Sequence, residues 1–206
     1  MNFKTYSESK QQYTENIKQT IVDVAAMILQ EQGPEAVTIR RVADKMECST
    51  KIIYNLFHNK DGLIKLLYLE GCNVLANSFK SVNRQNNMED YLQALCEAYW
   101  DFSHNYTSYY QLMFGGAFGE FKPEEESIQA TNTALEQFTQ VIIEAIEAEL
   151  IAEKDPLEVV RIIWASLHGV IHLYQGGHIE SSEAAKSLYD KSVKNIIQIY
   201  MYNSNS

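Results

Sequence analysis

Basic side chains are concentrated between residues 38 and 60. This stretch contains five basic residues, which are Arg40, Arg41, Lys45, Lys51 and Lys60, and only two acidic ones. The acidic residues are Asp44 and Glu47, so the stretch has a net charge of +3. Lys and Arg side chains bind nucleic acids largely by neutralising phosphates and releasing counterions. This stretch could therefore attach to a phosphate backbone. The alternative is an ordinary solvated face, so the elements that position these residues decide between the two.

The stretch has the pattern of two short helices joined by a tight turn. Thr38 is a suitable N-cap, because its hydroxyl can accept from backbone amides of the first turn. Apolar residues then recur on one helical face at Ile39, Val42, Ala43 and Met46. Ser49 offers a second N-cap, and Ile53 and Phe57, four residues apart, can pack back on the first helix. The pattern is a helix-turn-helix, which places its second helix in the DNA major groove.

The run Ser49-x4-Tyr54-x2-Phe57-x2-Lys60-x2-Leu63 resembles the recognition helix and the following helix of the tetracycline-repressor (TetR) family. Thr38-Ile39-Arg40 with Val42-Ala43 resembles the family's second helix, and the helix that ends at Gln32-Gly33-Pro34 is similar to its first. Two positions depart from the family. Glu47 stands where a glycine is usual, and glycine reaches positive φ without steric cost. Ile52 stands where a small polar residue is common, and an aliphatic side chain can touch a thymine methyl instead of hydrogen-bonding a base.

The resemblance implies that the outward side of this motif contacts double-stranded operator DNA. We expect the recognition helix, which follows Ser49, to enter the major groove with Thr50, Lys51, Ile52, Tyr54 and Asn55. Phosphate contacts are expected from Thr38, Arg40 and Lys60. The alternative for Tyr54 is a core or surface tyrosine, and for Ile52 it is packing within the domain. Two-fold symmetry implies a palindromic operator with half-sites about one helical turn, or a multiple, apart.

The charge distribution divides the chain. Residues 1–70 contain nine basic and nine acidic side chains, whereas residues 71–206 contain eight basic and eighteen acidic ones and carry the whole formal charge of −10. DNA repels the acidic remainder, which would help to orient the N-terminal end toward it. We predict a helix-turn-helix DNA-binding domain over residues 1–60 and a ligand-binding and dimerisation domain over residues 61–206.

Helical periodicity continues along the chain, and no β pattern of useful length and no internal repeat appears. Helices are expected at 17–29 (stopped by Gly33-Pro34), 60–82, 88–105, 123–153, from the capping-box-like Asp155-Pro156-Leu157-Glu158 onward, and at 182–201, with a short apolar stretch at 109–114. The predicted fold class is all-α, with an N-terminal three-helix helix-turn-helix domain and a C-terminal helical bundle.

The C-terminal part carries a second resemblance. The run Tyr-Tyr-Gln-Leu-Met-Phe-Gly at 109–115, followed by Trp164-x3-His168-Gly169, resembles the regulatory domain with a Trp-x3-His-Gly motif found in the same family. This implies a helical bundle that holds a pocket for an unknown small-molecule effector and forms a homodimer through its last two long helices. The candidate pocket residues are Tyr99, Phe102, Tyr106, Tyr110, Met113, Phe114, Trp164 and His168. The competing interpretation is that these aromatic side chains fill the bundle core.

Apolar residues on the last two helices can supply the dimer seam: Ile162, Ile163, Leu167, Val170 and Ile171 on one, and Leu188, Val193, Ile196, Ile197 and Tyr200 on the other. His168 and His172 have a spacing that can bind a metal, but no third ligand is evident from the sequence. We therefore interpret both as structural or pocket histidines and expect no metal and no cofactor. Three dispersed cysteines, Cys48, Cys72 and Cys96, form no disulfide pattern and fit a reducing cytoplasm.

Signatures of enzymes are absent from the sequence: it has no Gly-x-Ser-x-Gly elbow, no Gly-rich phosphate loop and no His-Glu-x-x-His, so we do not expect an enzyme. The N-terminus is polar, and the uncharged segment 162–179 contains three histidines and a glutamine, so we expect a cytoplasmic protein without a membrane span. We predict a homodimeric bacterial transcriptional regulator of the TetR type, a repressor released from its operator by a ligand. The alternatives are a nucleoid-associated protein and a ligand-binding module that use the same fold without ligand-controlled repression.

Overall fold

The computed structural model describes residues 5–116, 118 and 121–202, and these residues contain no strand. The helices are α1 (Tyr6–Gln32), η1 (Pro34–Ala36), α2 (Ile39–Lys45), α3 (Thr50–Phe57), α4 (Lys60–Lys80), α5 (Met88–Asn105), α6 (Thr107–Phe114), α7 (Glu125–Ala134), α8 (Glu136–Glu147), α9 (Pro156–Gln175) and α10 (Ser182–Tyr202). The predicted all-α fold class is confirmed. Every helix in the described ranges is too short or too polar to span a lipid bilayer.

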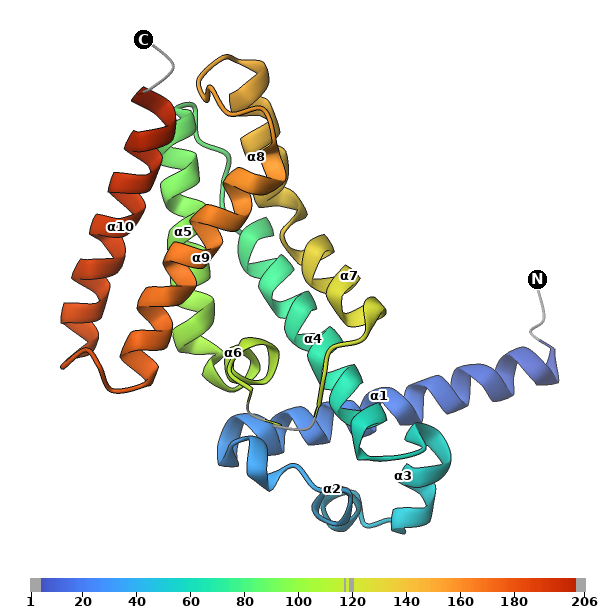
Figure 1. Cartoon of the computed structure of the whole chain (residues 1–206). Helices are drawn as coiled ribbons and strands as arrows, with labels where there is room; N and C mark the ends of the chain where they lie inside the picture. The colour runs from blue at the N-terminus through green and yellow to red at the C-terminus, as the bar shows by residue number, and fades with distance from the viewer. Residues whose placement is uncertain (1–4, 117, 119–120, 203–206) are drawn as a thin grey trace. The chain divides into compact units, whose positions relative to one another are not determined.

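The helices group into two compact units. The head unit comprises residues 1–71 and 106–127, and the bundle unit comprises residues 72–105 and 128–206. In the head unit, α1, α2 and α3 lie together around the N-terminal end of α4 (Figure 1). The first half of α4 belongs to the head unit and its second half to the bundle unit. The expected functional boundary between residues 60 and 61 stays a prediction.

α1 begins eleven residues before the first apolar residue of the expected helix, Ile17. A capping box starts it: the Glu8 amide donates to Thr5 Oγ1 at 3.3 Å, and the Thr5 amide donates to the Glu8 carboxylate at 2.6 Å. Polar residues dominate this first part, so no apolar period marked it in the sequence. The helix ends at Gly33, which has a φ of 80°, as the Gly-Pro pair predicts.

The turn between α2 and α3 takes a conformation that favours glycine, although it contains Glu47. Glu47 has a φ of 51°, and the Cys48 amide after it donates to the Ala43 carbonyl at 3.0 Å. The Cβ of an L-residue crowds the backbone in this region of φ, so the turn carries local strain. Before the turn, Thr38 caps α2 by accepting from the Arg41 amide at 3.2 Å, as predicted. Ser49 occupies the N-cap position of α3, but its side chain makes no capping hydrogen bond.

The single helix expected over 123–153 is wrong: α7 and α8 are separated at Leu135. The Leu135 amide is shared between the carbonyls of Thr131 and Asn132, at 3.1 and 3.2 Å, which tightens the chain locally. The Thr139 hydroxyl donates to the Leu135 carbonyl at 3.1 Å, a side-chain contact that bends helices. α8 then ends early, because Glu149 adopts a φ of 58°.

Hydrogen bonds from polar side chains tie the bundle helices together. Tyr189 of α10 donates its hydroxyl to the Cys96 carbonyl of α5 at 2.6 Å. Gln137 of α8 donates its amide to the Phe79 carbonyl of α4 and to the Tyr91 hydroxyl of α5, both at 2.9 Å. Asp155 caps α9, because its carboxylate accepts from the backbone amides of Leu157 and Glu158 at 2.9 and 3.3 Å. The predicted start of α9 is therefore confirmed.

Replacing Glu47 by glycine is expected to stabilise the protein by about 0.5–1 kcal/mol, because glycine adopts a positive φ without a Cβ clash. Thermal unfolding followed by circular dichroism measures this as a higher Tm. Glu47→Gln is the matched control, since it removes the charge but keeps the Cβ. A Tm that rises equally in both variants would show that charge, and not backbone strain, is responsible.

Candidate nucleic-acid interface and bundle cavity

All eight residues predicted to contact DNA are exposed in the head unit, on α3, the first residue of α4 and the beginning of α2. The opposite side of α3 is buried, with Ile53 and Phe57 at 0% and 4% exposure. By contrast, Ile52 and Tyr54 are 43% and 49% exposed. α2 and α3 therefore pack through the apolar residues that the pattern indicated. Contact of the exposed residues with DNA stays a prediction.

A tight junction fixes α3 to α4. His58 has φ and ψ of 66° and −47°, and the Asn59 amide donates to the Phe57 carbonyl at 2.8 Å, which closes a three-residue γ-turn. Asn59 Oδ1 then accepts from the Gly62 amide at 2.9 Å and caps the first turn of α4. A Cβ on Gly62 would lie 2.1 Å from the Phe57 carbonyl oxygen, so this position requires glycine. Sequence reasoning placed a helix start here but missed the roles of His58 and Gly62.

Two lysines in the first half of α4 have different surroundings. Lys65 pairs with Glu124 at 3.1 Å and with Glu126 at 2.7 Å, and hydrogen bonds to these carboxylates raise the pKa of its ammonium group. Lys60 is exposed, and its Nζ lies 5.2 Å from the ring centroid of Phe118. Lys60 therefore suits an external anion better than Lys65, which agrees with its predicted phosphate contact.

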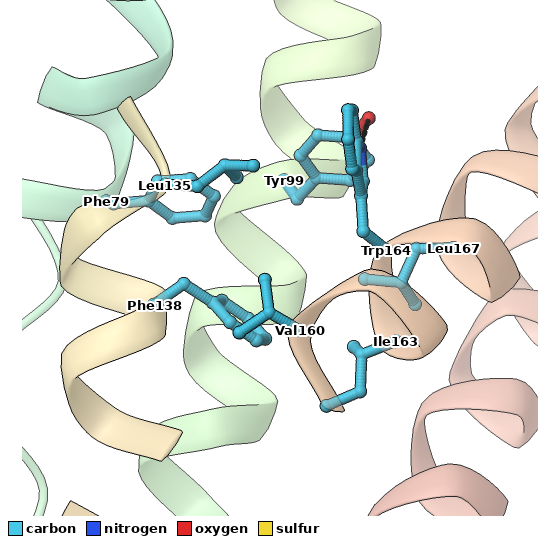
Figure 2. A pocket seen from close by; sticks show the side chains of 8 residues that line it. All are labelled: Phe79, Tyr99, Leu135, Phe138, Val160, Ile163, Trp164 and Leu167. Atoms are coloured by element: carbon cyan, nitrogen blue, oxygen red, sulfur yellow. Dashed lines mark hydrogen bonds between the residues drawn. The ribbon is translucent and has the colours of Figure 1, made fainter. Parts of the chain in front are cut away.

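An apolar cavity lies inside the bundle unit (Figure 2). Its lining comes from α4, α5, α8, α9 and the residue between α7 and α8: Phe79, Tyr99, Leu135, Phe138, Val160, Ile163, Trp164 and Leu167. The cavity measures about 10 Å³, which is roughly the space for one water molecule. Pockets for drug-sized ligands are usually about 300–1,000 Å³. A ligand can therefore enter only if the lining side chains move.

A hydrogen-bonded cluster at the edge of this cavity links α5 to α9. Trp164 Nε1 donates to the Tyr99 hydroxyl at 2.8 Å, and the same hydroxyl lies 3.4 Å from His168 Nδ1. Figure 2 shows the ring of Trp164 beside that of Tyr99. Burial, assisted by the neighbouring His172, lowers the pKa of His168 to about 4, so its imidazole is neutral at pH 7. The Trp-x3-His spacing thus brings two side chains of α9 to one hydroxyl of α5.

The structure separates the predicted pocket residues into two groups. Tyr99 and Trp164 line the cavity, His168 reaches it through the Tyr99 hydroxyl, and the buried ring of Phe102 lies 6.5 Å from that of Tyr99. Four others belong to the head unit and do not line this cavity: Tyr106, Tyr110, Met113 and Phe114. In that unit α6 packs closely on α4, since a Cβ on Gly71 would lie 2.8 Å from Met113 Sδ.

Six lining residues were missed by sequence reasoning: Phe79, Leu135, Phe138, Val160, Ile163 and Leu167. They share the helical spacing of ordinary core residues, so the sequence held no signal that distinguished a cavity wall from a filled core. The part of the chain that the structure describes contains no group of three or more His, Cys, Asp or Glu side chains placed to hold a metal ion.

Two family models match the chain. One, described as "Bacterial regulatory proteins, tetR family", covers residues 21–67, and the other, "Tetracyclin repressor-like, C-terminal domain", covers residues 92–196. The chain belongs to the tetR family. The predicted resemblance of residues 38–63 is thereby confirmed, and the Trp164, His168 and Gly169 motif lies within the second match.

Solved structures share the fold of this TetR-family chain at low sequence identity. A protein of unknown function from Rhodococcus sp. RHA1 gives a TM-score of 0.72 at 17% identity, covering 89% of this chain and 95% of that one. The TetR family transcriptional regulator PfmR from Thermus thermophilus gives 0.63 at 17% identity, with 86% and 97% covered. A TetR variant from Acinetobacter baumannii AYE, in complex with minocycline, gives 0.65 at 16% identity, with 92% and 98% covered. None of the curated proteins matches the chain significantly.

Acidification is expected to destabilise this TetR-family protein through His168. The unfolded imidazole titrates near pH 6.5 and the folded one near 4, so unfolding takes up a proton between these values. The contribution of His168 is fully present above pH 6.5 and is lost as the pH falls toward 4. Denaturant midpoints between about pH 7 and about 4.5 should therefore fall less steeply in His168→Gln than in the unaltered protein. Identical slopes would contradict the role assigned to His168.

Proposed function

We propose that the chain is a homodimeric transcriptional repressor that leaves a palindromic operator when a small molecule binds its bundle unit. The observation that carries the DNA-binding part is the exposed side of α3 within the segment matched by the tetR-family model. There Lys51, Ile52, Tyr54 and Asn55 are exposed while Ile53 and Phe57 are buried. A recognition helix needs this division, because one side holds the domain together and the other reads the groove.

Electrostatics favours approach to DNA through the head unit. The stretch 38–60 has a net charge of +3 in a chain whose formal charge is −10. DNA phosphates attract the basic stretch 38–60 and repel the acidic rest of the chain. The electrostatic field of the protein therefore favours binding of DNA through this stretch. Arg40, Lys51 and Lys60 are exposed in this stretch and supply candidate phosphate contacts.

The proposed effector is a mainly apolar, uncharged molecule with one polar group. No charged side chain lines the cavity between the described helices, so a charged effector would lose its hydration without compensation. The Tyr99 hydroxyl, already bonded to Trp164 and close to His168, is the polar group that such a molecule would meet. The Acinetobacter TetR variant with a similar fold forms a complex with minocycline, which supports a small-molecule effector for this chain.

The proposed release mechanism is a shift between two conformations. The cavity of about 10 Å³ is too small for an effector, so the effector must favour a conformation in which the lining has opened. Phe79, in the second half of α4, lines the cavity, and Lys60 begins the same helix. A movement of α4 would therefore change the placement of Lys60 and weaken operator binding. Thermodynamic reciprocity then requires operator DNA to weaken the binding of the effector by the same factor.

The proposed dimer uses residues that a single chain leaves exposed. On α9 these are Ile162, Ala165, Gly169 and Leu173, and on α10 they are Ala184, Leu188, Asn195 and Ile199. Each set lies along one helical face, and together they fit a four-helix seam. Part of the expected seam was wrong, because Ile163, Leu167, Ile171 and Ile197 are 0–2% exposed within one chain. Those residues lie in the core of one protomer, so the proposed seam leaves them out.

The experiment that tests the function is a mobility shift of the purified protein with its own upstream DNA over a salt series. Tight, sequence-selective binding that weakens steeply with salt is expected. Addition of small apolar compounds should then release the DNA. Binding to many sequences without preference, and without any effect of ligands, would favour the nucleoid-associated alternative. Ligand binding with no DNA binding, even after random-site selection, would favour the ligand-binding module.

Lys60→Ala is expected to weaken operator binding about tenfold, since it removes a charge-assisted phosphate contact. The slope of log affinity against log salt should fall by about 0.9 for each subunit. Lys80→Ala is the matched control, because Lys80 is also exposed and lies at the other end of α4. Equal affinities for Lys60→Ala, Tyr54→Ala and the unaltered protein would refute the placement of the DNA surface.

Gly169→Arg is expected to give monomers in sedimentation velocity at concentrations where the unaltered chain is dimeric. A Cβ at this position would meet no atom within 4 Å, so the protomer can accept a side chain there. A closely packed helix–helix seam cannot accept an arginine side chain at this position, because the side chain would keep the partner's helix from approaching. Ile128→Arg is the control on α7, since Ile128 is 53% exposed and lies outside the proposed seam. A Gly169→Arg dimer as stable as the control would show that the seam lies elsewhere.

A further inference from the structure

Ile52 is a large aliphatic residue left at the surface of a helix that buries its neighbour. Its side chain is 43% exposed, whereas Ile53 is 0% exposed. Single exposed apolar residues are common on proteins, so exposure alone assigns no role to Ile52. Its position within α3 does, because it lies in the part of a recognition helix that reads bases.

Ile52 is the third residue of α3 and lies on the side opposite the core. A helix advances about 100° per residue, which places Lys51, Ile52 and Asn55 together, away from Ile53 and Phe57. All three are exposed. In helix-turn-helix proteins the N-terminal residues of the second helix contact base edges in the major groove. The face that contains Ile52 is therefore the one that meets the bases.

The chemistry of an isoleucine side chain restricts what it can contact there. It offers no hydrogen-bond donor or acceptor, and the one apolar group in the major groove is the C5 methyl of thymine. Against guanine or cytosine it would remove water from polar groups without replacing their hydrogen bonds, which costs free energy. Asn55, three residues along the same face, has an amide suited to adenine. This face of α3 thus matches both bases of A·T pairs.

We propose that Ile52 is a specificity-determining residue that contacts the C5 methyl group of one thymine in each operator half-site. The inference rests on the proposed function and extends it to the identity of a base. It predicts that the operator contains a thymine whose methyl group, and not its hydrogen-bonding edge, is recognised.

The test begins with random-site selection to define the half-site. Each thymine is then replaced by deoxyuridine, which keeps every hydrogen-bonding group and lacks the methyl. At one thymine position, this replacement should weaken binding about fourfold when it is made in one half-site. When it is made in both half-sites, binding should weaken about fifteenfold, because one buried methyl contact is lost in each half-site. Ile52→Ala should bind more weakly and should be insensitive to deoxyuridine at that position. Ile52→Val, which keeps a branched side chain, should stay sensitive.

Tyr54→Ala is the matched control, because it should lose affinity and still respond to deoxyuridine. Circular dichroism and sedimentation establish that each variant folds and dimerises as the unaltered protein does. The proposal is overturned if deoxyuridine costs the same affinity in Ile52→Ala as in the unaltered protein at every thymine, or if the selected half-site contains no thymine. Failure to select any sequence would instead overturn the proposed function, and this inference with it.

Discussion

The orientation of α3, the helix proposed to read DNA, depends on one backbone contact that leaves no room for a side chain. The Phe57 carbonyl lies so close to Gly62 that a Cβ there would be 2.1 Å from its oxygen. The same carbonyl accepts from the Asn59 amide, and Asn59 in turn caps α4. α3 and α4 therefore meet at an angle set by backbone atoms, with His58 held at a positive φ. Because this junction fixes the rotation of α3, it decides which side chains face outward.

The two faces of α9 have different surroundings. Trp164 and His168 point to the Tyr99 hydroxyl and link α9 to α5, while Gly169 lies on an exposed face. The three residues of the motif therefore act on different sides of the helix. The inward pair also stands at the edge of a cavity with room for about one water molecule, so α5 and α9 cannot separate to admit a ligand without disturbing these contacts.

Two helix starts were predictable from the sequence. Thr38 and Asp155 cap α2 and α9 as predicted, because the capping side chain bonds to an amide only two or three residues further along the chain. The break at Leu135 was not, since it arises from a shared amide and a threonine hydroxyl within a continuous apolar pattern. Periodicity also did not show which apolar residues of α9 lie in the protomer core and which are exposed. Ile162 is exposed and Ile163 is buried, and only the packing of the helices distinguishes them. The same limit hid the cavity wall, because Phe79 and Phe138 have the spacing of core residues.

The size of the cavity bears on how the proposed repressor would respond to an effector. If the conformation with this small cavity is the one that binds the operator, the apparent affinity for an effector is reduced by the fraction of molecules in which the cavity has widened. α4, a continuous helix of 21 residues and about 30 Å, then carries the linkage, since Phe79 and Lys60 lie on it. An effector that fitted both conformations equally well would bind without releasing DNA. In the proposed mechanism, selectivity for the effector therefore depends both on the free energy of moving Phe79, Tyr99 and Trp164 apart and on the contacts made once the cavity is filled.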